Sequence, residues 1–458
     1  MSVDTNNAAF QDALNLIQYT RQSVFLTGKA GTGKSTFLRY VCEHTKKKHV
    51  VLAPTGIAAI NAGGSTMHSF FKLPFYPLLP DDPNLSLQRG RIHEFFKYTK
   101  PHRKLLEQIE LVIIDEISMV RADLIDAIDR ILRVYSHNLR EPFGGKQLLL
   151  VGDVFQLEPV VKNDEREILN RAYPTPYFFS ARVFSQIDLV SIELQKVYRQ
   201  TDSVFVSVLD HIRTNTAGAA DLQLLNTRYG SHIEESEADM YITLATRRDT
   251  VDSINEKKLA ELAGEPITFE GSIEGDFPES SLPTSQELVL KPGAQIIFIK
   301  NDFDRRWVNG TIGVIAGIDE EEETIYVITD DGKECDVKRE SWRNIRYRYN
   351  EKTKEIEEEV LGSFTQYPIR LAWAITVHKS QGLTFSRVVI DFTGGVFAGG
   401  QAYVALSRCT SLDGIQLKKP INRADIFVRP EIVNFAGRFN DRQACLLYTS
   451  PSPRDMRR

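Results

Sequence analysis

The chain has 458 residues, of which 42% are hydrophobic and 26% charged, and its formal net charge is −5. These values are typical of a soluble globular protein with more than one domain, and they exclude a disordered chain. No apolar run approaches the length needed to span a bilayer, and the polar N-terminus has no signal-peptide core. We therefore expect no membrane partner, with a cytoplasmic location in a bacterium or a nuclear or mitochondrial one in a eukaryote.

The cysteine positions and the net charge limit which metal sites, disulfides and nucleic-acid contacts are expected. Cys42, Cys335, Cys409 and Cys445 lie far apart without a C-x-x-C pair, so neither a disulfide framework nor a zinc site is indicated. The acidic balance gives no global basic signature, so any contact with nucleic acid has to come from a local groove.

The first predicted element is an amphipathic helix over residues 12–19, where Ala13, Leu14 and Ile17 are the apolar positions. Gln11 opens this helix. Its side-chain amide carries both a donor and an acceptor, which suits the edge of an adenine. A solvent-exposed residue at a helix start explains Gln11 equally well.

A phosphate-binding loop follows the apolar run of residues 23–27, which reads as a buried strand. Residues 28–35 fit G-x-x-x-x-G-K-[ST] at every fixed position, and the next segment is competent to form a helix. Lys34 is expected to reach the β- and γ-phosphates of ATP, and Ser35 to bind Mg²⁺. A glycine-rich turn without a ligand is the alternative, and the flanking strand and helix argue against it. The residues expected to hold the nucleotide here are Gly28, Ala30, Gly31, Thr32, Gly33, Lys34, Ser35 and Thr36.

A second strand-helix unit runs from the strand 49–53 through Pro54, Thr55 and Gly56 into an alanine-rich helix. Loops at the carboxyl ends of parallel strands are where ligands bind.

The pattern then breaks from residue 65 to about 104, where Thr66, His68, Phe75 and Tyr76 occur among further aromatic and basic residues. Such a mixture suits stacking on bases and holding phosphates. A small satellite core under a loop is an equally good interpretation.

Two acids end the next apolar strand, residues 111–114. Asp115 is expected to bind the magnesium shell and Glu116 to orient or deprotonate the attacking water. The alternative is that these acids cap the following helix. A further helix, a Pro-Phe-Gly-Gly turn and the strand 148–151 come next, and Gln156 follows that strand. Its side-chain amide is neutral and both donates and accepts hydrogen bonds, which suits a sensor of the γ-phosphate.

A second α/β pattern follows, with strands predicted near residues 188–194, 240–245 and 388–391 and no second phosphate-binding loop. We interpret it as a partner of the first half. Arg199 and Arg408, taken as exposed, are candidates for arginine fingers that neutralise charge on the phosphates. Either one alone is more often a surface ion-pair residue.

A small antiparallel barrel is predicted over residues 295–367, because short apolar runs there are joined by turns such as that at Asp330 to Gly332. Beyond it, His378, Lys379, Ser380 and Gln381 offer hydrogen bonds suited to phosphates. A satisfied core histidine remains the alternative for His378. The basic Ser/Pro segment 446–458 is expected to be disordered.

Together these segments resemble the ordered motif set of superfamily-one DNA helicases, and most closely the petite-integration-frequency (Pif-one) family. The motifs that carry the resemblance are GKAGTGKST, APTGIAA, STMHSFF, IIDEISMV, PFGGKQLLLVGDVFQLEPV, VYRQ, TVHKSQGLTF and YVALSRC. One departure is Glu158, where the family usually has proline.

The resemblance implies a role for each matching residue. It makes Gln11 the adenine reader, Lys34 and Ser35 the phosphate and metal ligands, and Asp115 and Glu116 the metal and water residues. It makes Gln156 the sensor, Arg199 and Arg408 the fingers, and Gly382 a further nucleotide-binding residue. The residues placed on the DNA side are Pro54, Thr55, Gly56, Thr66, His68, Phe75, Tyr76, His378, Lys379, Ser380 and Gln381.

The implied protein is an α/β motor of two RecA-like parallel-sheet domains, with a small inserted wedge domain and an inserted SH3-like β-barrel. The predicted boundaries are 1–64 with 108–180 for the first domain, 65–107 for the wedge, 181–294 with 368–435 for the second domain, and 295–367 for the barrel. The implied cofactors are ATP and Mg²⁺, and the implied partners are single-stranded DNA and its junctions with duplex.

As a motor, the chain is expected to move 5′-to-3′ and unwind duplex or structured DNA in genome maintenance. We expect a monomer, with a DNA-induced dimer as the alternative. Two other functions share these motifs: a RecD-like subunit of a larger complex, and a P-loop switch that hydrolyses ATP without unwinding.

Overall fold

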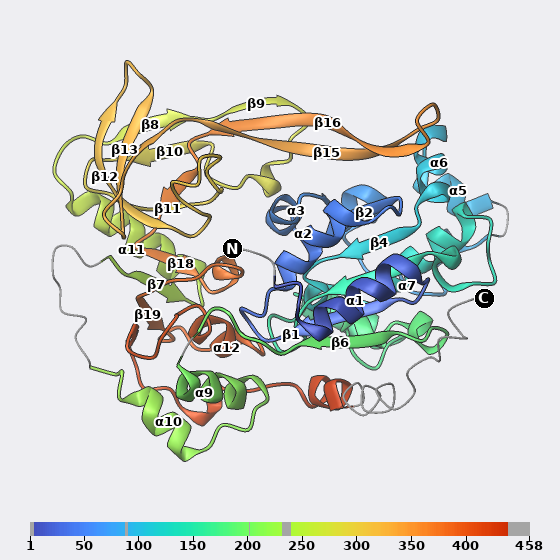
Figure 1. Cartoon of the computed structure of the whole chain (residues 1–458), viewed down its shortest axis with the longest axis horizontal. Helices are drawn as coiled ribbons and strands as arrows, with labels where there is room; N and C mark the ends of the chain where they lie inside the picture. Colours follow the sequence, from blue (N-terminus) through green and yellow to red (C-terminus); the bar gives the residue numbers. More distant parts are fainter. Residues whose placement is uncertain (1–3, 88–89, 201, 231–239, 438–458) are drawn as a thin grey trace. The chain divides into compact units, whose positions relative to one another are not determined.

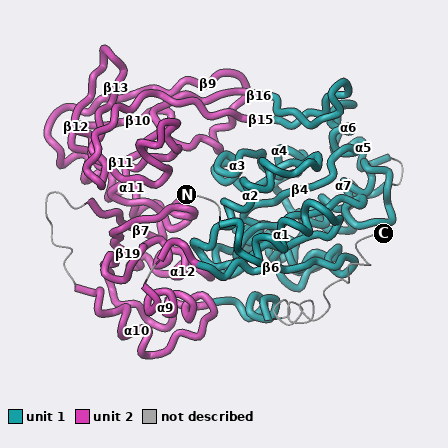
Figure 2. The backbone as a smooth tube through the Cα atoms, viewed as in Figure 1, with its two compact units in different colours: residues 1–196, 346–359, 428–458 teal, residues 197–345, 360–427 magenta. Residues whose placement is uncertain are grey.

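The chain divides by its contacts into two units, which Figure 2 shows in two colours. Unit 1 comprises Met1–Lys196, Arg346–Glu359 and Val428–Arg458, and unit 2 comprises Val197–Ile345 and Val360–Phe427. The computed structural model describes residues 4–87, 90–200, 202–230 and 240–437. The segment 446–458, for which disorder is predicted, lies outside the described residues.

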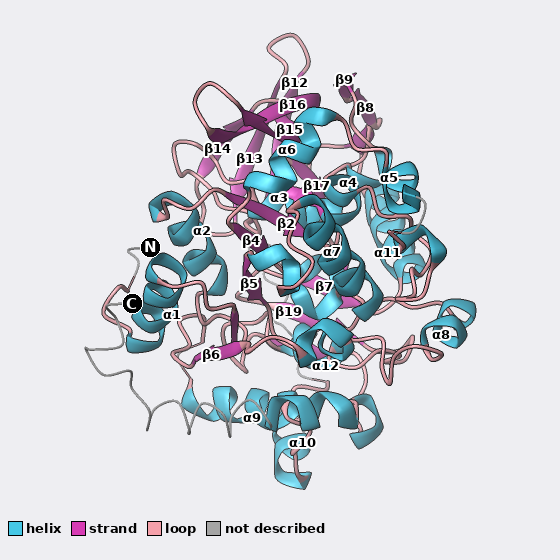
Figure 3. Cartoon of the chain, turned by 90° about the vertical axis from the view of Figure 1, so that its right-hand side faces the viewer, coloured by secondary structure: helices cyan, strands magenta, loops and turns pink. Residues whose placement is uncertain are grey.

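Unit 1 is built on a six-stranded sheet in the order β3-β2-β4-β5-β1-β6, with every neighbouring pair parallel. Its strands are β1 (Val24–Gly28), β2 (His49–Ala53), β3 (Ser65–Thr66), β4 (Leu111–Ile114), β5 (Gln147–Val151) and β6 (Val190–Leu194). Its helices are α1 (Ala8–Tyr19), α2 (Lys34–His44), α3 (Gly56–Ala62), α4 (Met67–Phe71), α5 (Arg91–Phe96), α6 (Lys100–Gln108), α7 (Ala122–Tyr135) and α8 (Asn163–Leu169). Figures 1 and 3 show these helices around the strands.

The strand near residues 188–194 does not open the second half of the molecule, as the sequence pattern suggested. It is β6, and it pairs with β1 over the full length from Val24↔Val190 to Gly28↔Leu194. Residues 190 and 193 are only partly buried, as suits the last strand of a sheet. The prediction was wrong because strand spacing along the chain does not reveal which sheet an edge strand joins.

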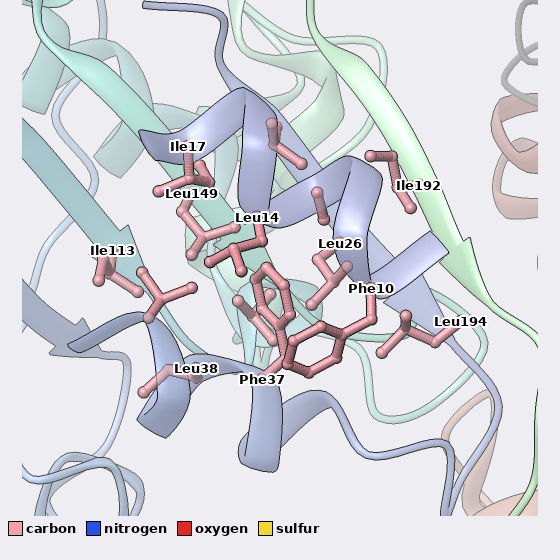
Figure 4. Packing of buried hydrophobic residues seen from close by; sticks show 14 of the residues in the cluster. Phe10, Leu14, Ile17, Leu26, Phe37, Leu38, Ile113, Leu149, Ile192 and Leu194 are labelled. Atoms are coloured by element: carbon pink, nitrogen blue, oxygen red, sulfur yellow. The ribbon is translucent and has the colours of Figure 1, made fainter. Parts of the chain in front are cut away.

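The core of unit 1 lies where α1 and α2 pack on the strands, as the close view in Figure 4 shows. Phe10 of α1 meets Phe37 of α2 edge to face, with ring centroids 4.9 Å apart. Ala13, Leu14 and Ile17 are buried as their helical spacing predicted, but the helix begins earlier, at Ala8. Asn7 caps it by accepting a hydrogen bond from the backbone N–H of Phe10.

Two segments from late in the chain complete unit 1. Tyr347 is buried, its hydroxyl accepts a hydrogen bond from the backbone N–H of Val51 at 3.3 Å, and its ring lies edge-on to Phe70. Phe435 stacks on Phe179 with centroids 4.1 Å apart. Unit 1 is therefore not a continuous stretch of sequence.

Unit 2 has its own parallel sheet, in the order β18-β7-β19-β20. Its strands are β7 (Ile242–Ala245), β18 (Ala374–Thr376), β19 (Val388–Asp391) and β20 (Ile415–Leu417), and its helices are α9 (Ser203–Arg213), α10 (Ala219–Asn226), α11 (Arg248–Glu261) and α12 (Gln401–Leu406). With two parallel sheets accompanied by helices, the predicted mixed α/β class is confirmed.

An antiparallel part lies between these strands in the sequence. The five-stranded sheet β14-β13-β12-β11-β17 is made of β11 (Gln295–Phe298), β12 (Ile312–Asp319), β13 (Thr324–Thr329), β14 (Glu334–Val337) and β17 (Ile369–Leu371). The remaining strands are β8 (Ile267–Glu270), β9 (Ser272–Gly275), β10 (Glu287–Leu290), β15 (Glu340–Asn350) and β16 (Glu355–Gln366). The predicted turn between β13 and β14 is present, with Gly332 at φ 78°.

The apolar centre of this part is a cluster that includes Phe298 and Trp307, whose rings stack at 4.3 Å, and the fully buried Tyr367. Within the described residues, no helix is both long and apolar enough to cross a membrane.

Candidate nucleotide and DNA sites

The loop 28–35 adopts the geometry of a phosphate cradle. Gly31 and Gly33 have φ of 80° and 91°, which glycine adopts without strain. Helix α2 then begins at Lys34 with no side chain capping its first turn, so its N–H groups face the loop. The Lys34 ammonium donates to the carbonyl oxygens of Gly28 at 2.6 Å and Lys29 at 3.0 Å, which holds it over the loop.

Steric crowding explains why position 28 is a glycine. A Cβ at this position would lie 2.6 Å from the carbonyl oxygen of Leu194 on β6. The loop therefore leaves β1 in close contact with the neighbouring strand, which fixes where the cradle begins.

The paired acids lie at the carboxyl end of β4, as predicted. The backbone N–H of Asp115 donates to Leu52 of β2 at 2.9 Å, and the N–H of Glu116 donates to the Asp115 carboxylate at 2.9 Å. Glu116 has a φ of 50°, a strained value for a residue with a side chain, and such strain is common at functional sites. Burial raises the pKa of Asp115, while the positive charge of Lys34 lowers it.

These residues fit Mg²⁺. The Ser35 hydroxyl is exposed and the Asp115 carboxylate is desolvated, and hard oxygen donors of this kind are the ligands that Mg²⁺ prefers. A cation next to Asp115 would offset the cost of burying its charge. Among the described residues, no group of three or more His, Cys, Asp and Glu side chains is placed to hold a metal.

Gln156 follows β5, the strand between β1 and β4 in the sheet. It is only 8% exposed, and its amide nitrogen lies 3.4 Å from the carboxylate of the buried Asp153. Asp153 stands in the same motif, although the sequence pattern alone suggested no role for it. Its contact with Gln156 indicates that it orients the Gln156 amide.

Glu158, the departure from the family pattern, accepts a hydrogen bond from the hydroxyl of Tyr177 at 2.5 Å and lies 3.8 Å from the guanidinium of Arg429. The acid is thus accommodated by a phenol and by a basic residue from the late segment of unit 1.

Gln11 lies inside α1, where its amide nitrogen donates to the carbonyl of Thr5 at 2.7 Å.

The residues of unit 1 that are predicted to contact DNA follow β2 and β3, whose ends lie together because Ala53 pairs with Thr66 in the parallel register. Thr55 caps α3 by accepting from the N–H of Ala58, and Thr66 caps α4 by accepting from the N–H of Ser69. Each hydroxyl hydrogen stays available for an acceptor such as a phosphate oxygen.

His68 and Phe75 extend this surface. Their rings stack with centroids 4.9 Å apart, although six residues lie between them in the sequence. Phe75 is 80% exposed and Tyr76 52% exposed, whereas Phe70, Phe71, Phe96 and Tyr98 of the same segment are buried and in ring contact. The segment therefore does form the small satellite core that was the alternative, and Phe75 and Tyr76 stand outside it. Burial lowers the pKa of His68, with the charge of Arg121 adding to the effect, and the ring is therefore neutral at pH 7.

The two candidate fingers belong to unit 2, and their predicted exposure was wrong. Arg408 is 1% exposed, and its guanidinium donates to the carbonyls of Val404, Ser380 and Leu383. Arg199 is half-buried and donates to the carbonyl of Ser407 at 3.2 Å. The local sequence did not reveal this burial because, apart from that of Val404, the accepting carbonyls come from other segments of unit 2.

The segment 378–382 continues from β18. Burial lowers the pKa of His378. Ser380 is fully buried and its hydroxyl donates to Val377 at 2.7 Å, so in this structure its side chain positions the segment and does not present a donor for DNA, contrary to expectation. The amide nitrogen of Gln381 is buried without a hydrogen-bond partner, and Gly382 has a φ of 78°.

Comparisons with known proteins agree with one another. Residues 4–217 match the family model of PIF1-like helicases. The chain is 33% identical over 412 residues to the ATP-dependent DNA helicase Pif1 of Campylobacter jejuni, and the match covers 86% of this chain and 88% of that protein.

Solved structures of a Pif1 from Bacteroides are similar as well. The complex with ADP-AlF4 superposes with a TM-score of 0.87 at 40% identity, covering 96% of this chain and 98% of the other. The complex with single-stranded DNA has a TM-score of 0.68 at 40% identity, covering 97% and 98%.

Proposed function

The chain belongs to the PIF1-like helicase family, and from this we propose that it is an ATP-dependent DNA helicase that moves on single-stranded DNA and separates duplexes. Relatives of similar length carry this name, and the Bacteroides relative was solved with ADP-AlF4 and with single-stranded DNA. The observation that carries the proposal is that, within unit 1, the phosphate cradle after β1 and the loops after β2 and β3 lie at the carboxyl ends of strands of one parallel sheet.

We assign the chemistry of ATP hydrolysis to the residues at the cradle. Lys34 and the first N–H groups of α2 would hold the phosphates, and Ser35 and Asp115 would hold magnesium, which supplies charge neutralisation when bound. Glu116 would accept the proton of the attacking water, and Gln156, oriented by Asp153, would contact the γ-phosphate. Arg199 and Arg408 would be the residues that unit 2 supplies to this reaction.

The finer assignments rest on the family. We propose that residues 65–107 are the wedge, that the antiparallel part of unit 2 is an SH3-like barrel, that movement is 5′-to-3′, and that the chain acts as a monomer. The exposure of Phe75 and Tyr76 supports the wedge, and the five-stranded antiparallel sheet with its own apolar cluster supports the barrel.

The test compares ATP hydrolysis with and without single-stranded DNA and then the unwinding of 5′-tailed and 3′-tailed duplexes. We expect DNA to stimulate hydrolysis, the 5′-tailed duplex to be unwound preferentially, and Lys34→Ala to abolish hydrolysis while DNA binding persists. Stimulation without unwinding would favour a switch or a subunit that needs partners. Preference for the 3′ tail would refute the polarity but not the ATPase.

A further inference from the structure

The loop that carries Phe75 and Tyr76 is anchored by a buried residue on either side. We call residues 74–77 the aromatic tip. Leu73 before it and Leu78 after it are buried, whereas both aromatic rings of the tip are exposed. A proline at each end of the tip fixes the backbone angle φ there. The two exposed rings are therefore presented by a loop with little conformational freedom.

The anchor on the C-terminal side is a fully buried carboxylate. Asp123 lies in the first turn of α7 and accepts a hydrogen bond from the backbone N–H of Leu78 at 3.1 Å. Arg121 donates to both oxygens of this carboxylate, from Nε and from Nη2, at 2.9 Å each. The Asp123 side chain thus accepts three hydrogen bonds, and one of them holds the loop of the aromatic tip against α7.

Arg121 is in turn fixed to the body of unit 1. Its backbone forms an antiparallel bridge with Tyr177, and its Nη1 lies 3.7 Å from the carboxylate of Glu165 on α8. The Arg121–Asp123 pair is therefore a rigid support, and the aromatic tip is mounted on it.

Stability alone does not explain why this support is an ion pair. Replacing a buried ion pair by apolar residues of similar volume is often neutral or stabilising. Apolar side chains would, however, leave the buried N–H of Leu78 without an acceptor at this place. What the pair supplies is a fixed point at which the loop backbone meets α7.

We propose that Arg121 and Asp123 are positioning residues for strand separation, because they hold the aromatic tip in one orientation. The inference rests on the proposed function. Both side chains are buried, so they act through Phe75 and Tyr76 and not by touching DNA. A ring that stacks on a base interacts more strongly when it is ordered beforehand, because no conformational freedom is then lost on contact.

The test replaces the support and leaves the aromatic tip intact. Arg121→Met/Asp123→Leu fills the same space with apolar groups and should remain folded. It should slow the unwinding of a 5′-tailed duplex about 5- to 150-fold, which corresponds to the cost of ordering two side chains on contact. DNA-stimulated ATP hydrolysis should stay near the wild-type rate. Because Glu116 lies only five residues before Arg121, damage to the whole β4–α7 connection would instead lower both rates together.

Two further measurements separate positioning from a general structural role. In the Phe75→Ala/Tyr76→Ala background the same replacement of the support should cause no further loss of unwinding, because no rings remain to be positioned. Hydrogen exchange of the DNA-free chain, followed by mass spectrometry, should become faster in residues 74–80 when the support is replaced.

Arg133 and Asp129 provide a matched control on the same helix. The Nε of Arg133 lies 2.8 Å from the Asp129 carboxylate, which accepts from the backbone N–H of Phe143 at 2.6 Å. This pair supports a different loop, so Arg133→Met/Asp129→Leu should leave the ratio of unwinding to hydrolysis unchanged.

Asp123→Asn takes the place of the apolar replacement if that variant does not fold. It keeps the shape of the side chain, and Arg121 retains Glu165 as a partner. It should lower the ratio of unwinding to hydrolysis in the same direction, because one amide oxygen replaces the two oxygens that accept three hydrogen bonds.

Three results would each overturn the inference while the helicase assignment stands. They are a wild-type ratio of unwinding to hydrolysis in the folded support variant, unchanged exchange in residues 74–80, and an equal further loss of unwinding in the protein that lacks both rings. If the wild-type chain separates no duplex, the proposed function fails, and the role of the support in strand separation fails with it.

Discussion

Removing the exposed aromatic pair Phe75 and Tyr76 should uncouple strand separation from ATP hydrolysis. Both rings stand in solvent, 80% and 52% exposed, so neither supports the core of unit 1. Phe75→Ala would remove the stacking of this ring on His68, and an aromatic pair contributes about 0.5–1.5 kcal/mol. This is a small part of the roughly 5–15 kcal/mol by which a typical protein is stable.

The functional loss should be larger. Stacking of a base on an aromatic side chain contributes about 1–3 kcal/mol per base. If the pair meets the bases where strands part, its loss should slow unwinding by about 5- to 150-fold, because each 1.4 kcal/mol corresponds to a factor of ten. DNA-stimulated hydrolysis should stay close to the wild-type rate, because the nucleotide cradle draws on other loops.

The assay follows strand separation of a 5′-tailed duplex by fluorescence energy transfer, in parallel with phosphate release, for the double variant Phe75→Ala/Tyr76→Ala. Tyr19→Ala is a matched control, since Tyr19 is 79% exposed on the same unit, and it should behave as wild type. Unwinding at the normal rate would refute the wedge role. An equal loss of unwinding and hydrolysis would show that the pair belongs to the motor or its DNA grip.

Three other results are expected. Glu116→Gln should bind nucleotide normally in an equilibrium titration yet turn over about a hundredfold or more slowly, as for other lost general bases, and failure to bind would assign Glu116 to the metal or to the fold. Arg408→Lys should lower turnover about a thousandfold with little change in ATP affinity, because lysine lacks the planar fork; a wild-type rate would remove the finger role. His102 is 9% exposed and its Nε2 has no hydrogen-bond partner, and burial lowers its pKa from 6.5 to about 4. Between these two pH values the unfolded chain binds a proton at His102 that the folded chain does not bind. The free energy of unfolding therefore falls as the pH is lowered through this range. Urea unfolding followed by circular dichroism should show a loss of up to about 3 kcal/mol from this residue between pH 6.5 and 4, and His102→Gln should flatten that dependence unless the histidine is not its source.

The sequence was most informative where a motif directly follows its own strand. The cradle after β1, the acids after β4 and the glutamine after β5 occupy the expected places, because strand, loop and helix start are all encoded within about a dozen residues. The strand His49–Ala53 was predicted to the residue, since an apolar run that ends in Pro-Thr-Gly leaves little choice of boundary.

The sequence was least informative where the partner comes from elsewhere in the chain. The edge strand β6 was assigned to the wrong half, because its apolar pattern is compatible with either parallel sheet. The buried guanidinium of Arg408 donates to carbonyls of residues 380 and 383, which lie more than twenty residues away in the sequence. No local pattern carries this information.

The discontinuous make-up of unit 1 bears on its biosynthesis. Its aromatic cluster unites Phe25 and Phe178 with Phe435, and Tyr347 covers Val51. A ribosome releases the first 196 residues long before it reaches residues 347 and 435, so a nascent unit 1 carries its sheet with these sites uncovered. Residues 1–196 expressed alone should therefore be aggregation-prone and depend on chaperones for solubility. Removal of the segment from Val428 onward should likewise lower the yield of soluble protein, although every catalytic motif is retained.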